Sequence, residues 1–183
     1  MTSLEQALRS HAPADDREAA HLGRILDFVR RHDDPFDRRI AEDHLTGSAL
    51  ILTRSGGRIL LLHHRKLERW LQPGGHAEAG ETSGEAVALR EAREETGLAV
   101  ELHPTAPRPL DVDVHAIPAR PGEPAHAHLD LRYLALAPDG AEITRQDAET
   151  NDLRWFGWEE LATLDLDPGL TRAIVKARAW TSG

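Results

Sequence analysis

This sequence contains no cysteine, one methionine and one tyrosine, and aromatic residues make up only 4% of it. The lack of cysteine excludes a disulfide framework and suits a reducing compartment, so we expect a cytoplasmic protein. No apolar run approaches the length of a membrane span, and the N-terminus lacks the pattern of a secretory signal peptide. We therefore expect no membrane partner.

Positive charge is also scarce. The 183 residues include 22 Lys and Arg against 31 Asp and Glu, which gives a formal net charge of -9. This balance argues against long nucleic acid as a partner, because phosphate backbones are held by clustered Lys and Arg. It leaves a small phosphorylated substrate open, since a bound metal ion can supply positive charge locally.

The chain length favours one domain with a small appendage. Residues 2–32 show helical periodicity, and Asp15 to Glu18 form a capping box for the second helix. We therefore assign residues 1–40 to an N-terminal helical extension and residues 41–183 to the main domain. The extension is expected to pack on that domain or on a second subunit, which makes a homodimer the expected assembly.

Strand patterns begin after this extension. Apolar runs at 47–53 and 58–63 flank a Ser-Gly-Gly hairpin signal, and a strand is also expected over 98–102. Residues 110–116 and 126–134 alternate apolar and polar side chains, as half-buried strands do. A helix is expected where Asp167 precedes Pro168. Helices and strands are thus mixed, which indicates an α/β fold.

One stretch carries a concentrated acidic pattern. A glycine-rich loop, 74–81, leads into Thr82-Ser83-Gly84-Glu85, which has the form of a capping box. A helix is predicted from about 83 to 96, ending at Gly97. On it Glu91, Glu94 and Glu95 stand at i, i+3 and i+4, so their carboxylates share one face. Mg²⁺ or Mn²⁺, which prefer oxygen ligands, would relieve their repulsion.

These residues resemble the signature of the Nudix (MutT-like) hydrolases. That signature is Gly, five residues, Glu, seven residues, then Arg-Glu-apolar-x-Glu-Glu-x-Gly-apolar. Gly75 and Glu81 match its first half, and residues 90–98, beginning at Arg90, match its second half. One departure is that eight residues, rather than seven, separate Glu81 from Arg90. We place the additional residue in the loop at 82–84.

The resemblance implies a fold and a chemistry. The fold is an α/β/α sandwich around a mixed β-sheet, and the activity is metal-dependent hydrolysis of a phosphoanhydride bond. The substrate would be a nucleoside diphosphate linked to another moiety, or a nucleoside triphosphate. The implied metal ligands are the Gly75 carbonyl and the carboxylates of Glu91, Glu94 and Glu95. Arg90 would orient Glu91, and Glu81 would support these ligands without contacting the metal ion itself.

The general base and the substrate contacts are less constrained. The family places the base on this helix or on a downstream loop, which makes Glu94 or Glu149 the candidates, with Asp147 after Glu149. Substrate phosphates would meet three basic or imidazole side chains near the catalytic loop: Arg65, Lys66 and His76. Base identity, and hence the particular substrate, is left open by the few aromatic residues.

Two alternatives keep the same fold. One is a non-catalytic nucleotide or metabolite sensor, although sensors usually lose signature carboxylates and carry a DNA-binding domain. The other is an RNA 5′-end pyrophosphohydrolase, which the acidic charge disfavours. Isoprenoid diphosphate isomerisation is disfavoured because the families that perform it need a cysteine.

The alternating strands add one further candidate. If they pair, Asp111, Asp113 and His115 share a polar face with His126, His128 and Asp130. Two or three histidines with carboxylates can bind zinc. The competing interpretation, which we favour, is a half-exposed sheet face with cross-strand polar pairs.

Overall fold

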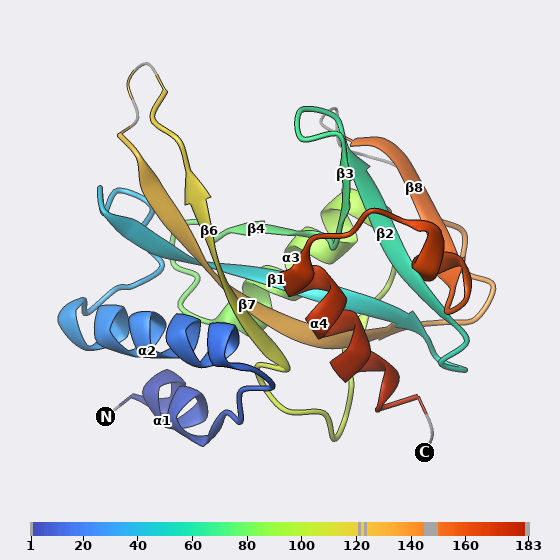
Figure 1. The fold of residues 1–183 in the computed structure, drawn as a ribbon, viewed down its shortest axis with the longest axis horizontal. Helices are drawn as coiled ribbons and strands as arrows, with labels where there is room; N and C mark the ends of the chain where they lie inside the picture. The colour runs from blue at the N-terminus through green and yellow to red at the C-terminus, as the bar shows by residue number, and fades with distance from the viewer. Residues whose placement is uncertain (1, 121, 123, 145–149, 182–183) are drawn as a thin grey trace.

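The computed structural model describes residues 2–120, 122, 124–144 and 150–181. Figure 1 shows a twisted sheet whose strands open into two arms, with helices on either side. None of the helices in the described ranges combines the length and apolar character that crossing a bilayer requires. The elements are α1 (Ser3–Ser10), α2 (Asp16–Arg31), β1 (Asp43–Thr53), β2 (Arg58–His64), β3 (Arg69–Leu71), β4 (Gly74–His76), α3 (Gly84–Thr96), β5 (Glu101–Leu102), β6 (Asp111–Ile117), β7 (His126–Ala137), β8 (Thr150–Gly157), a 3₁₀ turn (Glu160–Thr163) and α4 (Pro168–Arg178).

The sheet is mixed, as predicted. Its eight strands follow the order β3-β2-β1-β7-β5, with β4 paired to β1, β6 to β7 and β8 to β2. Strands β1 and β7 run parallel over their whole length, and the other pairs are antiparallel. The central strand β1 is buried at every position, so its side chains alternate between two covered faces.

The two faces of β1 enter two different hydrophobic clusters. Ala49 and Ile51 join a cluster with the apolar side of α3, whereas Leu50 and Leu52 join one with α4. In Figure 1, α3 and α4 accordingly lie on opposite sides of β1. This arrangement confirms the predicted α/β/α sandwich.

The N-terminal helices share the core of the main domain. Leu8, Ile25 and Phe28 are fully buried in the same cluster that contains the sheet-facing residues of α3. Glu18 is also fully buried and accepts hydrogen bonds from His11 Nε2 (2.7 Å) and from the Lys176 ammonium on α4. Of the two roles expected for the extension, packing on the main domain is the one this chain shows. The boundary at residue 40 stays a prediction.

Helix ends follow the predicted signals, with one shift. Asp15 caps α2 and Asp167 caps α4 through hydrogen bonds from their side-chain oxygens. Gly97 ends α3 in the left-handed region at φ 71°. The cap of α3 is Ser83, which accepts from the Ala86 amide; the prediction placed it one residue earlier, at Thr82.

One predicted strand is mostly absent. Of residues 98–102, only Glu101 and Leu102 pair with β7, as the short strand β5. The apolar residues that suggested a longer strand, Leu98 and Val100, are buried side chains of the connection that follows α3. Their apolar character thus reflects burial beside the helix end and not strand pairing.

Candidate functional site

Helix α3 carries the acidic pattern and lies directly against β1. Val87, Ala88 and Ala92 are fully buried on its inner face. The approach is close at Gly47 of β1, where an added Cβ would lie 2.5 Å from the Gly84 carbonyl oxygen. A residue without a Cβ is therefore required there, and the close contact fixes the height of the glutamates above the sheet.

Arg90 gathers the carboxylates of this site. Its Nη1 donates to Glu91 Oε1 (3.0 Å) and to Glu94 Oε2 (2.8 Å). Its Nη2 donates to the His76 carbonyl oxygen (2.6 Å), which ties the helix to β4. The hydrogen bonds to Glu81, followed by the charges of Glu91 and Glu94, raise the pKa of Arg90 above its ordinary value, although partial burial acts in the opposite direction. Arg90 thus stays charged and orients two of the expected ligands.

Glu81 supports Arg90 despite the additional residue between them. The Arg90 Nη2 to Glu81 Oε2 distance is 3.0 Å, and the same carboxylate accepts from the Glu78 amide at 2.9 Å. These bonds lower the pKa of Glu81, with the Arg90 hydrogen bond as the main cause. The prediction places the additional residue at 82–84, where α3 begins, and Arg90 still reaches both Glu81 and Glu94.

The loop before α3 lies against Glu91 and Glu95. An added Cβ at Gly75 would lie 2.6 Å from Glu91 Oε1, so the backbone of Gly75 and the Glu91 carboxylate are in close approach. Glu95 Oε2 accepts a hydrogen bond from the Gly74 amide at 2.9 Å. Burial raises the pKa of Glu91, while Arg90 lowers it and Glu94 adds to the increase. The Glu91 and Glu95 carboxylates thus both lie against the loop, at Gly75 and Gly74.

The other predicted site residues belong to parts of the chain outside α3. Arg65 and Lys66 are exposed in the turn between β2 and β3, and Arg65 Nε donates to Asn151 Oδ1 at 3.1 Å. His76 ends β4, directly after Gly75. The loop carboxylates Glu149 and Asp147 lie outside the described residues.

The polar face of β6 and β7 differs from the favoured prediction. The two strands pair, with Asp113 opposite Asp130 and His115 opposite His128, but the centre of this face is buried and not half exposed. Arg132 lies at that centre and is itself fully buried. It donates to three carboxylates and contacts one imidazole: Asp111 Oδ1 (3.1 Å), Asp113 Oδ2 (3.0 Å), Asp130 Oδ2 (3.3 Å) and His115 Nε2 (3.1 Å).

The histidines of this face are also grouped differently from the zinc hypothesis. His115 points to Arg132, whereas His128 lies with His44 of β1 and His76 of β4. Ligand atoms of these last three residues all lie within 4.8 Å of one another. His44 was not among the predicted residues. The available signal was the alternation of His44, Thr46 and Ser48, which places three polar residues on one face of the strand.

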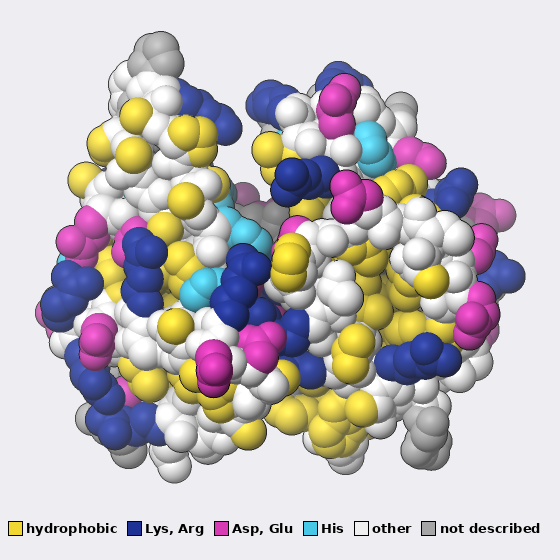
Figure 2. Space-filling model, viewed as in Figure 1, with side chains coloured by type: hydrophobic (Ala, Val, Ile, Leu, Met, Phe, Trp, Pro, Cys, Tyr) yellow, Lys and Arg dark blue, Asp and Glu magenta, His cyan; other side chains and the backbone are white. Residues whose placement is uncertain are grey.

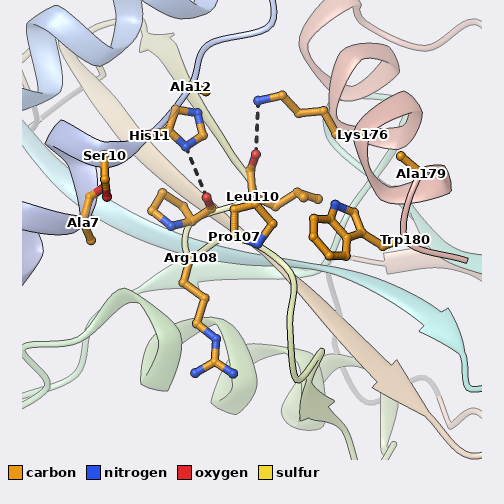
Figure 3. A pocket seen from close by; sticks show the side chains of 11 residues that line it. Ala7, Ser10, His11, Ala12, Pro107, Arg108, Leu110, Lys176, Ala179 and Trp180 are labelled. Atoms are coloured by element: carbon orange, nitrogen blue, oxygen red, sulfur yellow. Dashed lines mark hydrogen bonds between the residues drawn. The ribbon is translucent and has the colours of Figure 1, made fainter. Parts of the chain in front are cut away.

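The surface of the molecule is hollowed in two places. Figure 2 shows a notch between the two arms of the sheet, with histidine side chains at its base, over β4 and β6, and Lys or Arg side chains beside them. A second hollow, of about 350 Å³, lies away from the glutamates, between the end of α1, the 107–110 loop and α4 (Figure 3). It is lined mainly by apolar side chains and is crossed by hydrogen bonds from His11 to Pro109 O and from Lys176 to Leu110 O.

Known proteins share both the sequence pattern and the fold. The model of the NUDIX domain matches residues 43–176. A Mycobacterium tuberculosis protein named "Putative 8-oxo-dGTP diphosphatase 3" is 31% identical over 143 residues, which cover 72% of this chain and 61% of that protein. The chain therefore spans less than two thirds of the length of this curated relative.

Solved structures agree on the architecture. A NUDIX-family hydrolase from Clostridium perfringens superposes with a TM-score of 0.60 and 25% identity, over 74% of this chain and 97% of that one. The Ap4A hydrolase of C. elegans, in a binary complex, has a TM-score of 0.59 and 18% identity, over 76% and 98% of the two chains. The second likeness supports the fold alone. With a family model covering most of the chain and a fold that agrees, this protein belongs to the Nudix family.

Proposed function

We propose that this Nudix domain hydrolyses a phosphoanhydride bond with the help of Mg²⁺ or Mn²⁺. The substrate class is a nucleoside triphosphate or a nucleoside diphosphate linked to another moiety. Support comes from the Mycobacterium tuberculosis relative, whose name, "Putative 8-oxo-dGTP diphosphatase 3", refers to a nucleoside triphosphate. The intact signature carboxylates favour an enzyme over the alternative of a non-catalytic sensor.

The observation that carries the proposal is the approach of the loop to the helix. Gly75 lies so close to Glu91 that a single added carbon would overlap its carboxylate, and Glu94 is held beside Glu91 by Arg90. Carboxylates with a backbone carbonyl form an oxygen-only donor set, which hard divalent cations prefer. Glu91, Glu94, Glu95 and the Gly75 carbonyl therefore fit Mg²⁺ or Mn²⁺ by their chemistry.

A cation bound there would neutralise charge on the phosphates and make a bound water more acidic. The residues of the chain perform the remaining tasks. Arg90 positions Glu91 and Glu94, and Glu81 holds Arg90 in turn. Glu94, whose side chain is 55% exposed, is placed to accept a proton from water, with Glu149 as the other candidate base.

Positive charge for the substrate would come from the notch side of the sheet. Arg65 and Lys66 extend from the exposed β2–β3 turn, and His76 lies at the end of β4. We assign Arg65 and Lys66 to contacts with substrate phosphates; the His76 side chain, predicted for the same role, lies with His44 and His128. Lys and Arg bind phosphate oxygens through charge-assisted hydrogen bonds, and the exposed turn leaves both side chains accessible to a substrate.

The test is phosphate release from a panel of diphosphate-containing metabolites, with Mg²⁺ or Mn²⁺ added. Glu94→Gln should lower turnover by at least about 10²-fold, in line with the contribution of a general base. Glu85→Gln, a change of the same type in the first turn of α3, is the matched control and should keep wild-type turnover. Activity that persists in Glu94→Gln would refute the role of Glu94, and a folded wild type inactive on the whole panel would favour a sensor.

A further inference from the structure

We propose that His44, His76 and His128 form a second metal site, separate from the glutamates, that binds Zn²⁺ with one position left open. The three side chains come from three strands, and their ligand atoms all lie within 4.8 Å of one another. The Nε2 atoms of His76 and His128 are 3.1 Å apart. Two nitrogens on a tetrahedral zinc ion, each about 2.05 Å from it, are separated by about 3.3 Å. The observed spacing therefore suits shared coordination.

Strand register places these residues together. His44 of β1 is the partner of His128 in the parallel β1–β7 pair, and His76 of β4 is the partner of Thr46 in the antiparallel β1–β4 pair. His44 and Thr46 are two residues apart and so lie on the same face of β1. The cluster is built on paired strands, which hold ligands more accurately than loops do.

His44 supplies independent evidence for a ligand. Its side chain belongs to a residue that is only 4% exposed, and in the described part of the chain neither ring nitrogen makes a hydrogen bond. Buried polar groups normally have a partner, and an ion is one of the accepted explanations for an exception. The rings of His76, His126 and His128 all have their centroids within 5.1 Å of the His44 ring. A shared cation would satisfy this otherwise unpartnered side chain.

His126 gives the cluster a further neighbour. Its Nδ1 lies 3.0 Å from the Pro124 carbonyl oxygen, which only accepts, so Nδ1 carries the proton and the neutral ring has its lone pair at Nε2. That Nε2 lies 3.4 Å from Nε2 of His128. The Pro124 carbonyl thus fixes the tautomer of His126 and leaves an acceptor nitrogen beside the three proposed ligands.

The two sites would bind different metal ions, because one offers imidazole nitrogens and the other carboxylate oxygens. Neutral imidazole nitrogens favour Zn²⁺, whereas the carboxylates of α3 favour Mg²⁺ or Mn²⁺. The arrangement of three histidines with an open position is also the ligand set of catalytic zinc sites.

The experiment uses the full chain without an affinity tag, stripped of metal and then kept in millimolar Mg²⁺ to occupy the glutamates. Co²⁺ serves as the optical probe, because four-coordinate Co²⁺ on imidazoles absorbs visible light far more strongly than six-coordinate Co²⁺ on carboxylates. We expect one Co²⁺ per chain with the strong spectrum, displaced by one Zn²⁺. Zinc at 100 times its Kd should raise the Tm by about 5–11 °C.

Variants assign the site. His76→Gln and His128→Gln should each weaken zinc binding at least about 10-fold, by analogy with the loss of outer partners of a metal ligand. Two control variants should bind zinc as wild type does: His32→Gln, which changes the C-cap of α2, and Glu94→Gln, which changes the acidic site on α3. Since His76 is only half buried, its variant is the safer test if His128→Gln fails to fold. Zinc binding that is absent in wild type, unchanged in His76→Gln, or lost in Glu94→Gln would overturn the proposal. None of these measurements depends on turnover, so they stand apart from the test of hydrolysis.

Discussion

The contact between α3 and β1 makes a quantitative prediction at Gly47. In Gly47→Ala the new Cβ would lie 2.5 Å from the Gly84 carbonyl oxygen, 3.0 Å from the Ala88 amide nitrogen and 3.0 Å from Val87 Cβ. Close carbon–oxygen contacts in proteins lie at about 3.3–3.6 Å, so α3 and β1 must separate by roughly 1 Å. Because two of the three blocking atoms belong to the backbone, no side-chain rotation relieves the overlap.

Overpacking of this kind costs about 1–3 kcal/mol, and we expect the upper half of that range. For a chain of this size, 1 kcal/mol corresponds to about 2–4 °C in Tm, so Gly47→Ala should melt about 4–12 °C below wild type. The same displacement moves the glutamates relative to Gly75. Since a 1 Å misplacement of catalytic groups can cost about 10²-fold, turnover should fall by about 10- to 100-fold.

Thermal unfolding followed by circular dichroism, together with phosphate release at saturating Mg²⁺, measures both effects. Gly23→Ala is the matched control, because an added Cβ on that residue of α2 meets no atom within 4 Å. Alanine is favoured over glycine inside a helix by about 1 kcal/mol, so Gly23→Ala should melt about 2–4 °C higher than wild type, with unchanged turnover. A Gly47→Ala protein that melts within about 1 °C of wild type would refute the packing argument.

Two further changes test the loop and the attachment of the N-terminal helices. Gly75→Ala would place a methyl group 2.6 Å from Glu91 Oε1, and the flexible Glu91 side chain can move away from it. We therefore expect Tm to change by less than about 2 °C while turnover falls at least about 10-fold. A large drop in Tm together with the loss of turnover would contradict this. Glu18→Gln removes the nearer of two buried carboxylates beside the Lys176 ammonium, the other being Asp111, and should lower the free energy of unfolding at pH 7 by about 3 kcal/mol. Burial raises the pKa of Glu18, but the hydrogen bonds from His11, Lys176 and the Ala14 amide outweigh it and hold the pKa well below 4.5. This stabilisation is therefore fully present above pH 4.5 and is lost as the pH falls below it, so urea titrations from pH 7 to pH 3 should show a shallower decline for Glu18→Gln than for wild type.

Local signals predicted much of the fold, because they act within a few residues. The caps at Asp15 and Asp167 and the left-handed Gly97 each need only their own neighbours along the chain. The contact between Arg90 and Glu94 likewise follows from their i, i+4 spacing on a helix, and the structure joins them through a hydrogen bond.

The features that sequence alone did not predict depend on distant strands. Strand β1 begins at Asp43 and not at Gly47, because β7 runs beside it over eleven positions; this is why His44 was left out of the candidate site. Arg132 belongs to a strand whose alternation suggests a polar side open to solvent. Three carboxylates from β6 and β7 surround it instead, and although burial alone would lower the pKa of Arg132, they raise it.

Strand β4 connects the two chemistries proposed for this molecule. Consecutive residues of a strand point to opposite faces, and β4 presents Gly75 to the Glu91 carboxylate and His76 to His44 and His128. The His76 carbonyl also accepts from Arg90, so one peptide segment contacts the acidic site directly and the histidine cluster through the next side chain. A cation held by the three imidazoles would therefore restrain the same backbone that offers the Gly75 carbonyl to Mg²⁺. The proposed histidine site would thus hold β4 in place beside the glutamates of α3 that we propose as ligands of Mg²⁺ or Mn²⁺.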